Sequence, residues 1–226
     1  MPLYLVATPI GNLEDITLRA IRVLGEVGLI AAEDTRKTRK LLTHYNIKTR
    51  LTSYHEYSRR SKIPYLLGRL EQEDVALVSE AGMPGISDPG YELVQAAIDK
   101  NVPVIAIPGS SALPAALAVS GLPVNQFIYL GFLPRRKGKK VRLLKEIIAE
   151  PRTIIVFESP YRLLASLADI KETLGDRRIA VCRELTKIHE EVFRGRVSQA
   201  MSYFSQPRGE FTLVIEGSSG EYDDSC

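Results

Sequence analysis

A segment rich in glycine and proline, Glu80–Gly90, is the part of the chain whose residue types point most clearly to chemistry. It follows a short apolar run and precedes an amphipathic stretch, so we expect it to link a buried strand to a helix. Glycine permits positive φ and close approach of a ligand to the backbone. Open α/β sheets bind ligands at this end of their strands. A plain turn, with Asp88 as helix N-cap and Pro89 at the first helical position, explains the segment equally well.

Two more turns rich in small residues follow apolar runs, at Thr8–Asn12 and Pro108–Ala112. Ser110 and Ser111 precede a helical pattern, where hydroxyls and free amides can bind a carboxylate or phosphate. A serine N-cap is the simpler alternative for the same residues. Neither turn has the G-x-G-x-x-G or GK[ST] spacing of the common nucleotide-binding loops. We expect the three turns to converge on one ligand cleft.

Ionisable side chains also follow predicted strands. The candidates for a general base are Glu80, Asp34, His55 and Glu158, and Arg36 is a candidate cation for a phosphate or a developing alkoxide. Structural alternatives remain open, because Asp34 suits a helix N-cap and a lone histidine such as His55 is more often a packing residue. The histidines and cysteines show no metal-ligand spacing, so no metal is expected.

Basic residues form two clusters on a chain whose net charge is only +3, from 30 Lys and Arg against 27 Asp and Glu. The clusters lie in Arg36–Lys40 and Arg135–Lys145, and the second contains no acidic residue. Two such clusters suggest a polyanion contacted at selected places, although a solvated helix face is the alternative for each. The predicted RNA contacts are Arg36, Lys37, Arg39, Lys40, Arg135, Arg136, Lys137, Lys139 and Lys140.

Strand and helix patterns alternate along the 226 residues and predict an α/β protein of two domains. We expect a mostly parallel sheet in residues 1–120, a mixed sheet in 121–217, and a frayed tail at 218–226. Strands are predicted at Leu3–Ala7, Leu29–Ala32, Val75–Ser79, Val104–Ile107, Phe127–Leu130, Thr153–Phe157, Ile179–Arg183, Glu190–Gly195 and Phe211–Glu216. No apolar run approaches the ~20 residues of a membrane span. Two distant cysteines, Cys182 and Cys226, fit a reducing compartment, so we expect a cytoplasmic protein.

Eight segments, taken in order, resemble the tetrapyrrole (corrin/porphyrin) methylase superfamily of S-adenosylmethionine-dependent enzymes. They are Leu5–Thr17, Ala32–Arg36, Ser53–Glu56, Ser79–Gly90, Pro108–Ala112, Gly131–Pro134, Phe157–Arg162 and Arg183–Lys187. The Ser79–Gly90 loop has Gly82-Met83-Pro84 where tetrapyrrole-modifying members carry a GDP-type loop. It is similar to the branch that methylates a cytidine ribose 2′-OH in 16S rRNA.

The resemblance implies a cofactor, S-adenosylmethionine, in a cleft between two α/β domains, usually within a homodimer and without a metal. The cofactor contacts that it implies, together with the glycines of the loop, are Ile10, Gly82, Met83, Gly85, Ile86, Ser110, Ser111, Leu185, Phe211 and Thr212. The implied partner is 16S rRNA, within the small ribosomal subunit. The alternatives are a non-catalytic RNA-binding or ribosome-assembly factor and a tetrapyrrole methylase.

Overall fold

The computed structural model describes residues 1–55 and 59–218. The chain divides into two compact units, Met1–Ser111 and Ala112–Cys226. This division falls before the helix α5 (Ala112–Ser120), whereas the boundary expected from sequence falls after it. The predicted tail lies outside the described residues except for Ser218, whose amide donates to the Glu150 carbonyl at 2.6 Å.

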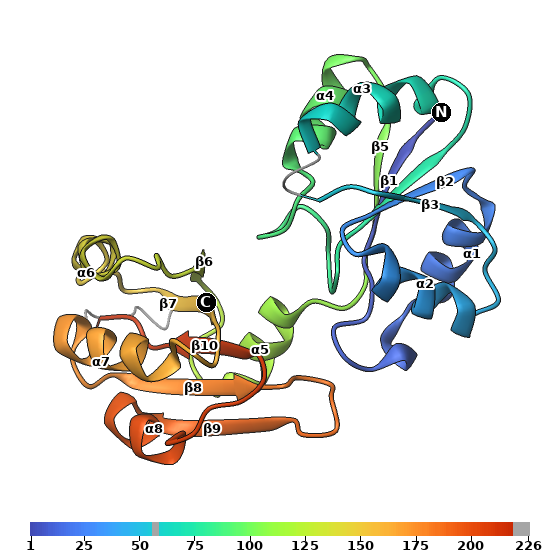
Figure 1. The fold of residues 1–226 in the computed structure, drawn as a ribbon. Coiled ribbons are helices and arrows are strands. Elements are labelled where there is room, and N and C mark those ends of the chain that lie inside the picture. The colour runs from blue at the N-terminus through green and yellow to red at the C-terminus, as the bar shows by residue number, and fades with distance from the viewer. Residues whose placement is uncertain (56–58, 219–226) are drawn as a thin grey trace. The chain divides into compact units, whose positions relative to one another are not determined.

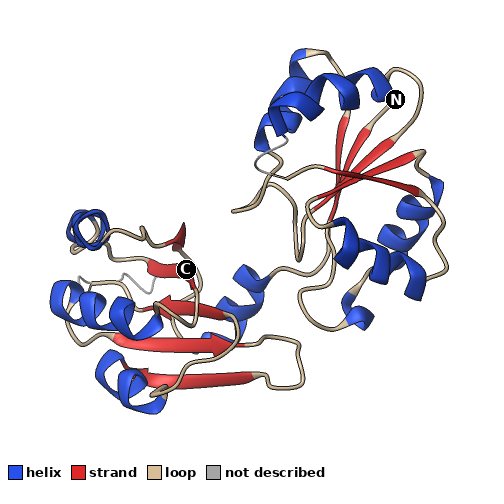
Figure 2. Ribbon diagram, in the orientation of Figure 1, coloured by secondary structure: helices blue, strands red, loops and turns tan. Residues whose placement is uncertain are grey.

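A five-stranded parallel sheet forms the centre of the first unit (Figure 2). Its strands are β1 (Leu3–Val6), β2 (Leu29–Ala32), β3 (Arg50–Ser53), β4 (Val75–Val78) and β5 (Val104–Ile107), in the order β3-β2-β4-β1-β5. Every residue of β2 and β4 is buried, because both faces of this sheet are covered. The predicted parallel sheet is therefore confirmed.

Helices cover both faces of this sheet, as Figure 1 shows. They are α1 (Leu18–Glu26), α2 (Thr35–His44), α3 (Arg59–Leu70) and α4 (Tyr91–Asp99), and a 3₁₀ turn, η1 (Leu13–Asp15), precedes α1. One apolar cluster lies under α1 and α2 and another under α3 and α4. The strand β3 is missing from the sequence-based prediction. It lies at the sheet edge and pairs only with β2, so it needs no long apolar run.

The second unit contains a mixed sheet, as predicted. Its elements after α5 are β6 (Phe127–Phe132), α6 (Lys137–Glu146), β7 (Thr153–Glu158), α7 (Leu163–Leu174), β8 (Arg178–Arg183), β9 (Glu191–Arg196), α8 (Val197–Tyr203) and β10 (Phe211–Ile215). The strand order is β6-β7-β10-β8-β9, with β6 parallel to β7 and the other pairs antiparallel.

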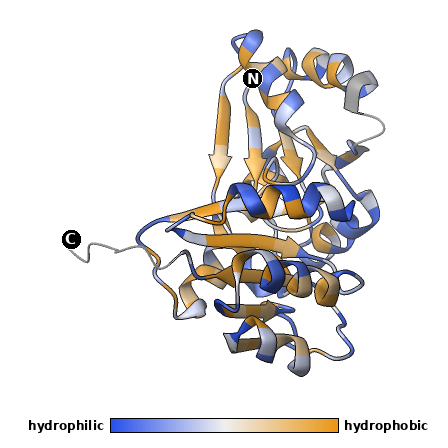
Figure 3. Ribbon diagram, turned by 90° about the vertical axis from the view of Figure 1, so that its left-hand side faces the viewer, coloured by the Kyte–Doolittle hydropathy of each residue, from blue (hydrophilic) through white to orange (hydrophobic). Residues whose placement is uncertain are grey.

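The main core of this unit lies between the sheet and the helices α6, α7 and α8. Figure 3 shows strands that are mostly hydrophobic and helices that carry both hydrophobic and hydrophilic residues. The helix α5 contacts β8, β9 and β10, and the Cys182 Sγ lies 3.9 Å from the Ala116 carbonyl oxygen. These contacts explain why α5 groups with the second unit. Within residues 1–55 and 59–218, no helix is both long and apolar enough to cross a membrane.

Candidate functional site

The three glycine- and serine-rich turns of the first unit meet at Gly82. The Thr8 amide donates to the Gly82 carbonyl at 2.9 Å, and the Gly82 amide donates back to Thr8 at 3.0 Å. Gly82 has φ of +79°, and a Cβ there would lie 3.4 Å from Ile10 Cγ2 and 3.6 Å from the Ser110 carbonyl oxygen. Because β4, β1 and β5 are neighbours in the sheet, their carboxyl-end turns form one surface.

This surface combines apolar side chains with a polar group that makes no hydrogen bond among the described residues. Ile10 and Met83 are half-buried, and Ile86 is 46% exposed. The buried hydroxyl of Thr8 has no hydrogen-bond partner among the described residues. A buried hydroxyl without a partner is costly, so a ligand with both apolar surface and hydrogen-bonding groups would suit this place.

One detail differs from the expectation for the serine turn. The Ser110 hydroxyl donates its proton to the Asp15 carbonyl oxygen at 2.9 Å. It is therefore committed to joining the β5 turn to the segment before α1, and it does not present a free donor to an anion. Ser111 immediately precedes α5, at the end of the first unit.

Two acidic side chains interact near this surface: Glu33 directly follows β2, and Asp88 lies in the loop between β4 and α4. Burial raises the pKa of Glu33. Burial, followed by the charge of Glu33, raises the pKa of Asp88 to about 6, and a hydrogen bond from Ser79 opposes the rise. The Glu80 amide donates to Glu33 Oε2 at 3.0 Å, which fixes one loop against the other.

Asp88 is a functional candidate that the sequence-based assignment used only as an N-cap. That cap assignment is wrong, because the N-cap of α4 is Gly90, without a side-chain hydrogen bond. Ser87 beside it has φ of +66°, a conformation that ordinary side chains rarely adopt. The sequence signal for Asp88 is its place among the turn residues of Ser79–Gly90, and its burial becomes evident only in the folded chain.

The other acidic candidates of the first unit are engaged with neighbours. Asp34 is the N-cap of α2 and accepts from the Arg36 amide at 2.8 Å, and this bond lowers its pKa. That pKa makes it a weak base. Glu80 forms an ion pair with Lys37. His55 lies near Glu33, and its charge opposes the rise in the pKa of Glu33. Glu56, the last residue of the predicted motif, lies outside the described part of the chain.

Glu158, the base candidate of the second unit, is part of a buried ion pair. Its side chain is fully buried and lies 2.6 Å from the Arg162 guanidinium. It also accepts from the Ser166 hydroxyl at 2.5 Å and from the Ser159 amide at 2.8 Å. These contacts hold the start of α7 against β7, so Glu158 has a structural role and is withdrawn as a base.

Lys140 is a second correction. It is 6% exposed, and its Nζ lies 2.7 Å from Asp169 Oδ2 and 3.2 Å from Ser166 Oγ. An RNA phosphate does not reach a cation in that position. The helix α6 begins at Lys137 rather than at Val141, where the pattern predicted it, and this places Lys140 on the face that packs on α7.

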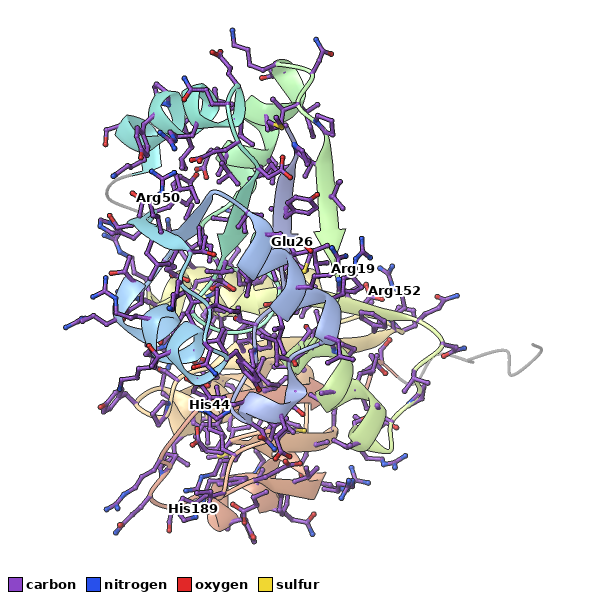
Figure 4. All side chains as sticks on the ribbon, turned by 90° about the vertical axis from the view of Figure 1, so that its right-hand side faces the viewer. Arg19, Glu26, His44, Arg50, Arg152 and His189 are labelled. Atoms are coloured by element: carbon purple, nitrogen blue, oxygen red, sulfur yellow. The ribbon has the colours of Figure 1, made fainter. Side chains whose placement is uncertain are left out.

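The remaining basic candidates are exposed. On α2 the buried side carries Thr38, Leu41 and Leu42, and the basic residues face outward. With Thr43 and His44, which is labelled in Figure 4, three of these basic residues line a shallow depression. The predicted RNA contacts that are exposed are Arg36, Lys37, Arg39, Lys40, Arg135, Arg136, Lys137 and Lys139.

The predicted cofactor contacts of the second unit do not share one face of β10. Phe211 packs in the core beneath the helices, with its ring 5.4 Å from that of Phe204, so only its backbone can reach a ligand. Thr212 alternates to the other face of the sheet. Leu185 is 8% exposed in the turn after β8. A cofactor contact by Leu185 or Thr212 stays a prediction.

Comparisons with known proteins agree with this fold. Residues 2–201 match the family Tetrapyrrole (Corrin/Porphyrin) Methylases. The proteins named ribosomal RNA small subunit methyltransferase I of Halalkalibacterium halodurans and Thermotoga maritima are 51% and 52% identical to this chain. Each alignment covers 95% of this chain, with 75% of the first relative and 98% of the second.

Solved structures of lower sequence identity share the fold. A diphthine synthase superposes with a TM-score of 0.79 at 14% identity, covering 98% of this chain and 92% of that chain. The uroporphyrin III C-methyltransferase of Thermus thermophilus gives 0.67 at 19% identity, covering 96% and 97%. The chain therefore belongs to the tetrapyrrole (corrin/porphyrin) methylase family, and within it this chain is similar to the proteins named ribosomal RNA small subunit methyltransferase I.

Proposed function

We propose that this protein transfers a methyl group from S-adenosylmethionine to the ribose 2′-oxygen of a cytidine in 16S rRNA, with the small ribosomal subunit as the physiological acceptor. The observation that carries the proposal is the 52% identity, over 95% of the chain, to a protein named for rRNA methylation. The joined turns at Gly82 support it, because they form a built ligand surface rather than three separate loops.

The residues around Gly82 fit an adenosyl ligand. Ile10, Met83 and Ile86 offer apolar surface, and the unpartnered Thr8 hydroxyl offers a hydrogen bond beside it. Gly82 adopts a positive φ of +79° that an L side chain would strain, and a Cβ there would stand between the turns, in van der Waals contact with Ile10. When bound, S-adenosylmethionine supplies a methyl group that is already activated on a positively charged sulfur.

The chain's own residues must position the acceptor hydroxyl and remove its proton. We propose Asp88 as the base, because it is partly buried, its pKa is about 6, and it lies at the same edge of the sheet as Gly82. At neutral pH it is deprotonated and still basic enough to accept a proton. A positioned base contributes roughly 10²–10⁴-fold to rate. Burial, and after it the charge of Glu33, holds the pKa of Asp88 high.

RNA binding is proposed for the exposed cations of α2 and for those at the start of α6. Arg36, Arg39 and Lys40 project from one side of α2 next to the turn that carries Glu33. Arg135, Arg136 and Lys137 lead into α6, whose first turn contains no acidic residue to offset them. Cations on a chain of small net charge give local affinity for phosphates. Assembly as a homodimer stays a prediction.

Methyl transfer to alternative acceptors tests the proposed function. The purified protein is incubated with labelled S-adenosylmethionine and, in parallel, with undermodified small subunits, free 16S rRNA and a tetrapyrrole. We expect label in the small subunits, and 2′-O-methylcytidine after nuclease digestion. Label in the tetrapyrrole alone would assign the alternative activity of the family. Salt-sensitive RNA binding without any methyl transfer would assign an assembly factor instead.

A further inference from the structure

An arginine-lined pocket in the second unit lies outside both predicted basic clusters. It has a volume of about 380 Å³ and is lined by the end of α5 and by the paired ends of β8 and β9. The three charged residues that line it are Arg178, Arg194 and Arg196. All of its lining residues belong to one unit and to the described part of the chain.

The three guanidinium groups lie on the same face of the sheet. Arg178 and Arg196 are register partners across β8 and β9. Residues directly opposite each other, and residues two apart along a strand, project to one side, so Arg194 joins them. Like charges placed opposite each other are unfavourable for sheet stability. An anion bound between them would remove this repulsion.

Main-chain carbonyl oxygens hold two of these arginines, and a carboxylate pairs with the third. Arg194 Nε donates to the Val119 carbonyl oxygen at 2.9 Å, and Arg194 Nη2 donates to the same oxygen, at the end of α5. Arg196 Nη1 donates to the Asp176 carbonyl oxygen at 2.8 Å. Carbonyl oxygens orient a guanidinium but do not neutralise it. The Arg178 guanidinium forms an ion pair with the Glu216 carboxylate, at 3.5 Å between Nη1 and Oε1. One of the three positive charges is therefore paired.

We propose that this pocket binds a backbone phosphate of the RNA substrate, as a third contact beyond α2 and α6. Fixed guanidinium groups present paired donors that match phosphate oxygens. The volume falls in the range of small-ligand sites and leaves room for the sugar next to the phosphate. The assignment of RNA as the source of the phosphate rests on the proposed function, while the arrangement of the arginines does not.

Salt-dependent RNA binding tests the proposal. The variants are Arg178→Gln, which removes no main-chain contact, and Arg194→Lys, which keeps the charge but loses the paired N–H donors of the guanidinium. The matched control is Arg152→Gln, labelled in Figure 4. Like Arg178, this exposed arginine is paired with a carboxylate, that of Glu150 at 2.7 Å, but it does not line the pocket. The probe is 16S rRNA, titrated at several KCl concentrations and followed by fluorescence anisotropy.

We expect Arg178→Gln to weaken RNA binding and to reduce the slope of log K against log salt by about 0.7–0.9, the value for one lost phosphate contact. Arg194→Lys should keep the slope and lose affinity, and Arg152→Gln should match the wild type. Unchanged affinity and slope in Arg178→Gln, with wild-type methyl transfer, would overturn the pocket assignment and leave the proposed function standing. Reduced slopes in a protein that methylates nothing would support the pocket and refute the function.

Inorganic phosphate distinguishes the source of the anion. We expect no saturable effect of micromolar phosphate on the melting temperature of the wild type. Tight phosphate binding that Arg178→Gln abolishes, without a change in RNA affinity, would assign the pocket to a small anion and overturn the proposal.

Discussion

Replacement of Asp88 by asparagine separates catalysis from stability. Asp88→Asn keeps the shape of the side chain and an acceptor for the Ser79 hydrogen bond, but it cannot take a proton. We expect turnover of the small-subunit acceptor to fall by roughly 10²–10⁴-fold, the contribution of a positioned base. We expect the affinity for S-adenosylmethionine, measured by calorimetry, to stay within about twofold, because no change is made at the Gly82 surface.

The stability of the same variant should rise at neutral pH. The pKa of Asp88 lies at about 6 in the folded protein against an ordinary value of 3.8. This difference corresponds to about 3 kcal/mol of cost to the charged native state, and partial exposure to solvent reduces it to about 1–2 kcal/mol. A raised carboxyl pKa means that the native state binds the proton more tightly. The wild type therefore gains stability relative to Asp88→Asn as pH falls from about 6 to 4.

The assays are urea unfolding at pH 7 and pH 4 and a pH profile of kcat/KM. The stability difference between wild type and Asp88→Asn should be present at pH 7 and absent at pH 4. The wild-type rate should fall as pH drops below about 6, and Glu33→Gln should move that fall to lower pH by removing the neighbouring charge. An Asp88→Asn variant with wild-type turnover, or with the same fall in rate below pH 6, would refute the assignment of Asp88 as the base.

Three other changes test the site and the corrections. Gly82→Ala and Gly85→Ala should each cost about 1–2 kcal/mol of stability, because both glycines have a positive φ. Only Gly82→Ala should lower cofactor affinity, because only its Cβ has a neighbour within 4 Å. Equal losses of affinity in calorimetry would contradict the joined-turn surface. Asp169→Leu should lower the free energy of unfolding, measured in urea, by about 3–5 kcal/mol, because Lys140 stays buried without its carboxylate. Adding Lys140→Met to this variant should restore most of the loss. An unchanged free energy of unfolding in Asp169→Leu would count against the burial of the pair. Arg39→Gln should reduce the salt slope of RNA binding by about 0.7–0.9 with unchanged cofactor affinity; an unchanged slope would remove α2 from the RNA surface.

The sequence by itself determined the elements that carry the site and the turns at which ligands can bind. Short runs such as Val75–Val78 are apolar at every position, which is the pattern of strands buried on both faces, and glycine and proline mark the turns after them. The edge strand β3 was not predicted, because a strand that pairs with a single neighbour at the sheet edge needs little apolar sequence. Charged residues in the first turn of α6 likewise concealed where that helix begins.

Only the tertiary structure decided which ionisable residues can act. The sequence predicted a base at Glu158 and an RNA contact at Lys140, and it used Asp88 only as a helix N-cap. Folding places Glu158 against Arg162 and Lys140 against Asp169, and each ion pair neutralises the charge of the predicted residue. Asp88 is instead brought next to the like charge of Glu33 in a partly buried place. For Lys140 and Asp88 the deciding partners, Asp169 and Glu33, are distant in sequence, and residue type and spacing do not encode such partners.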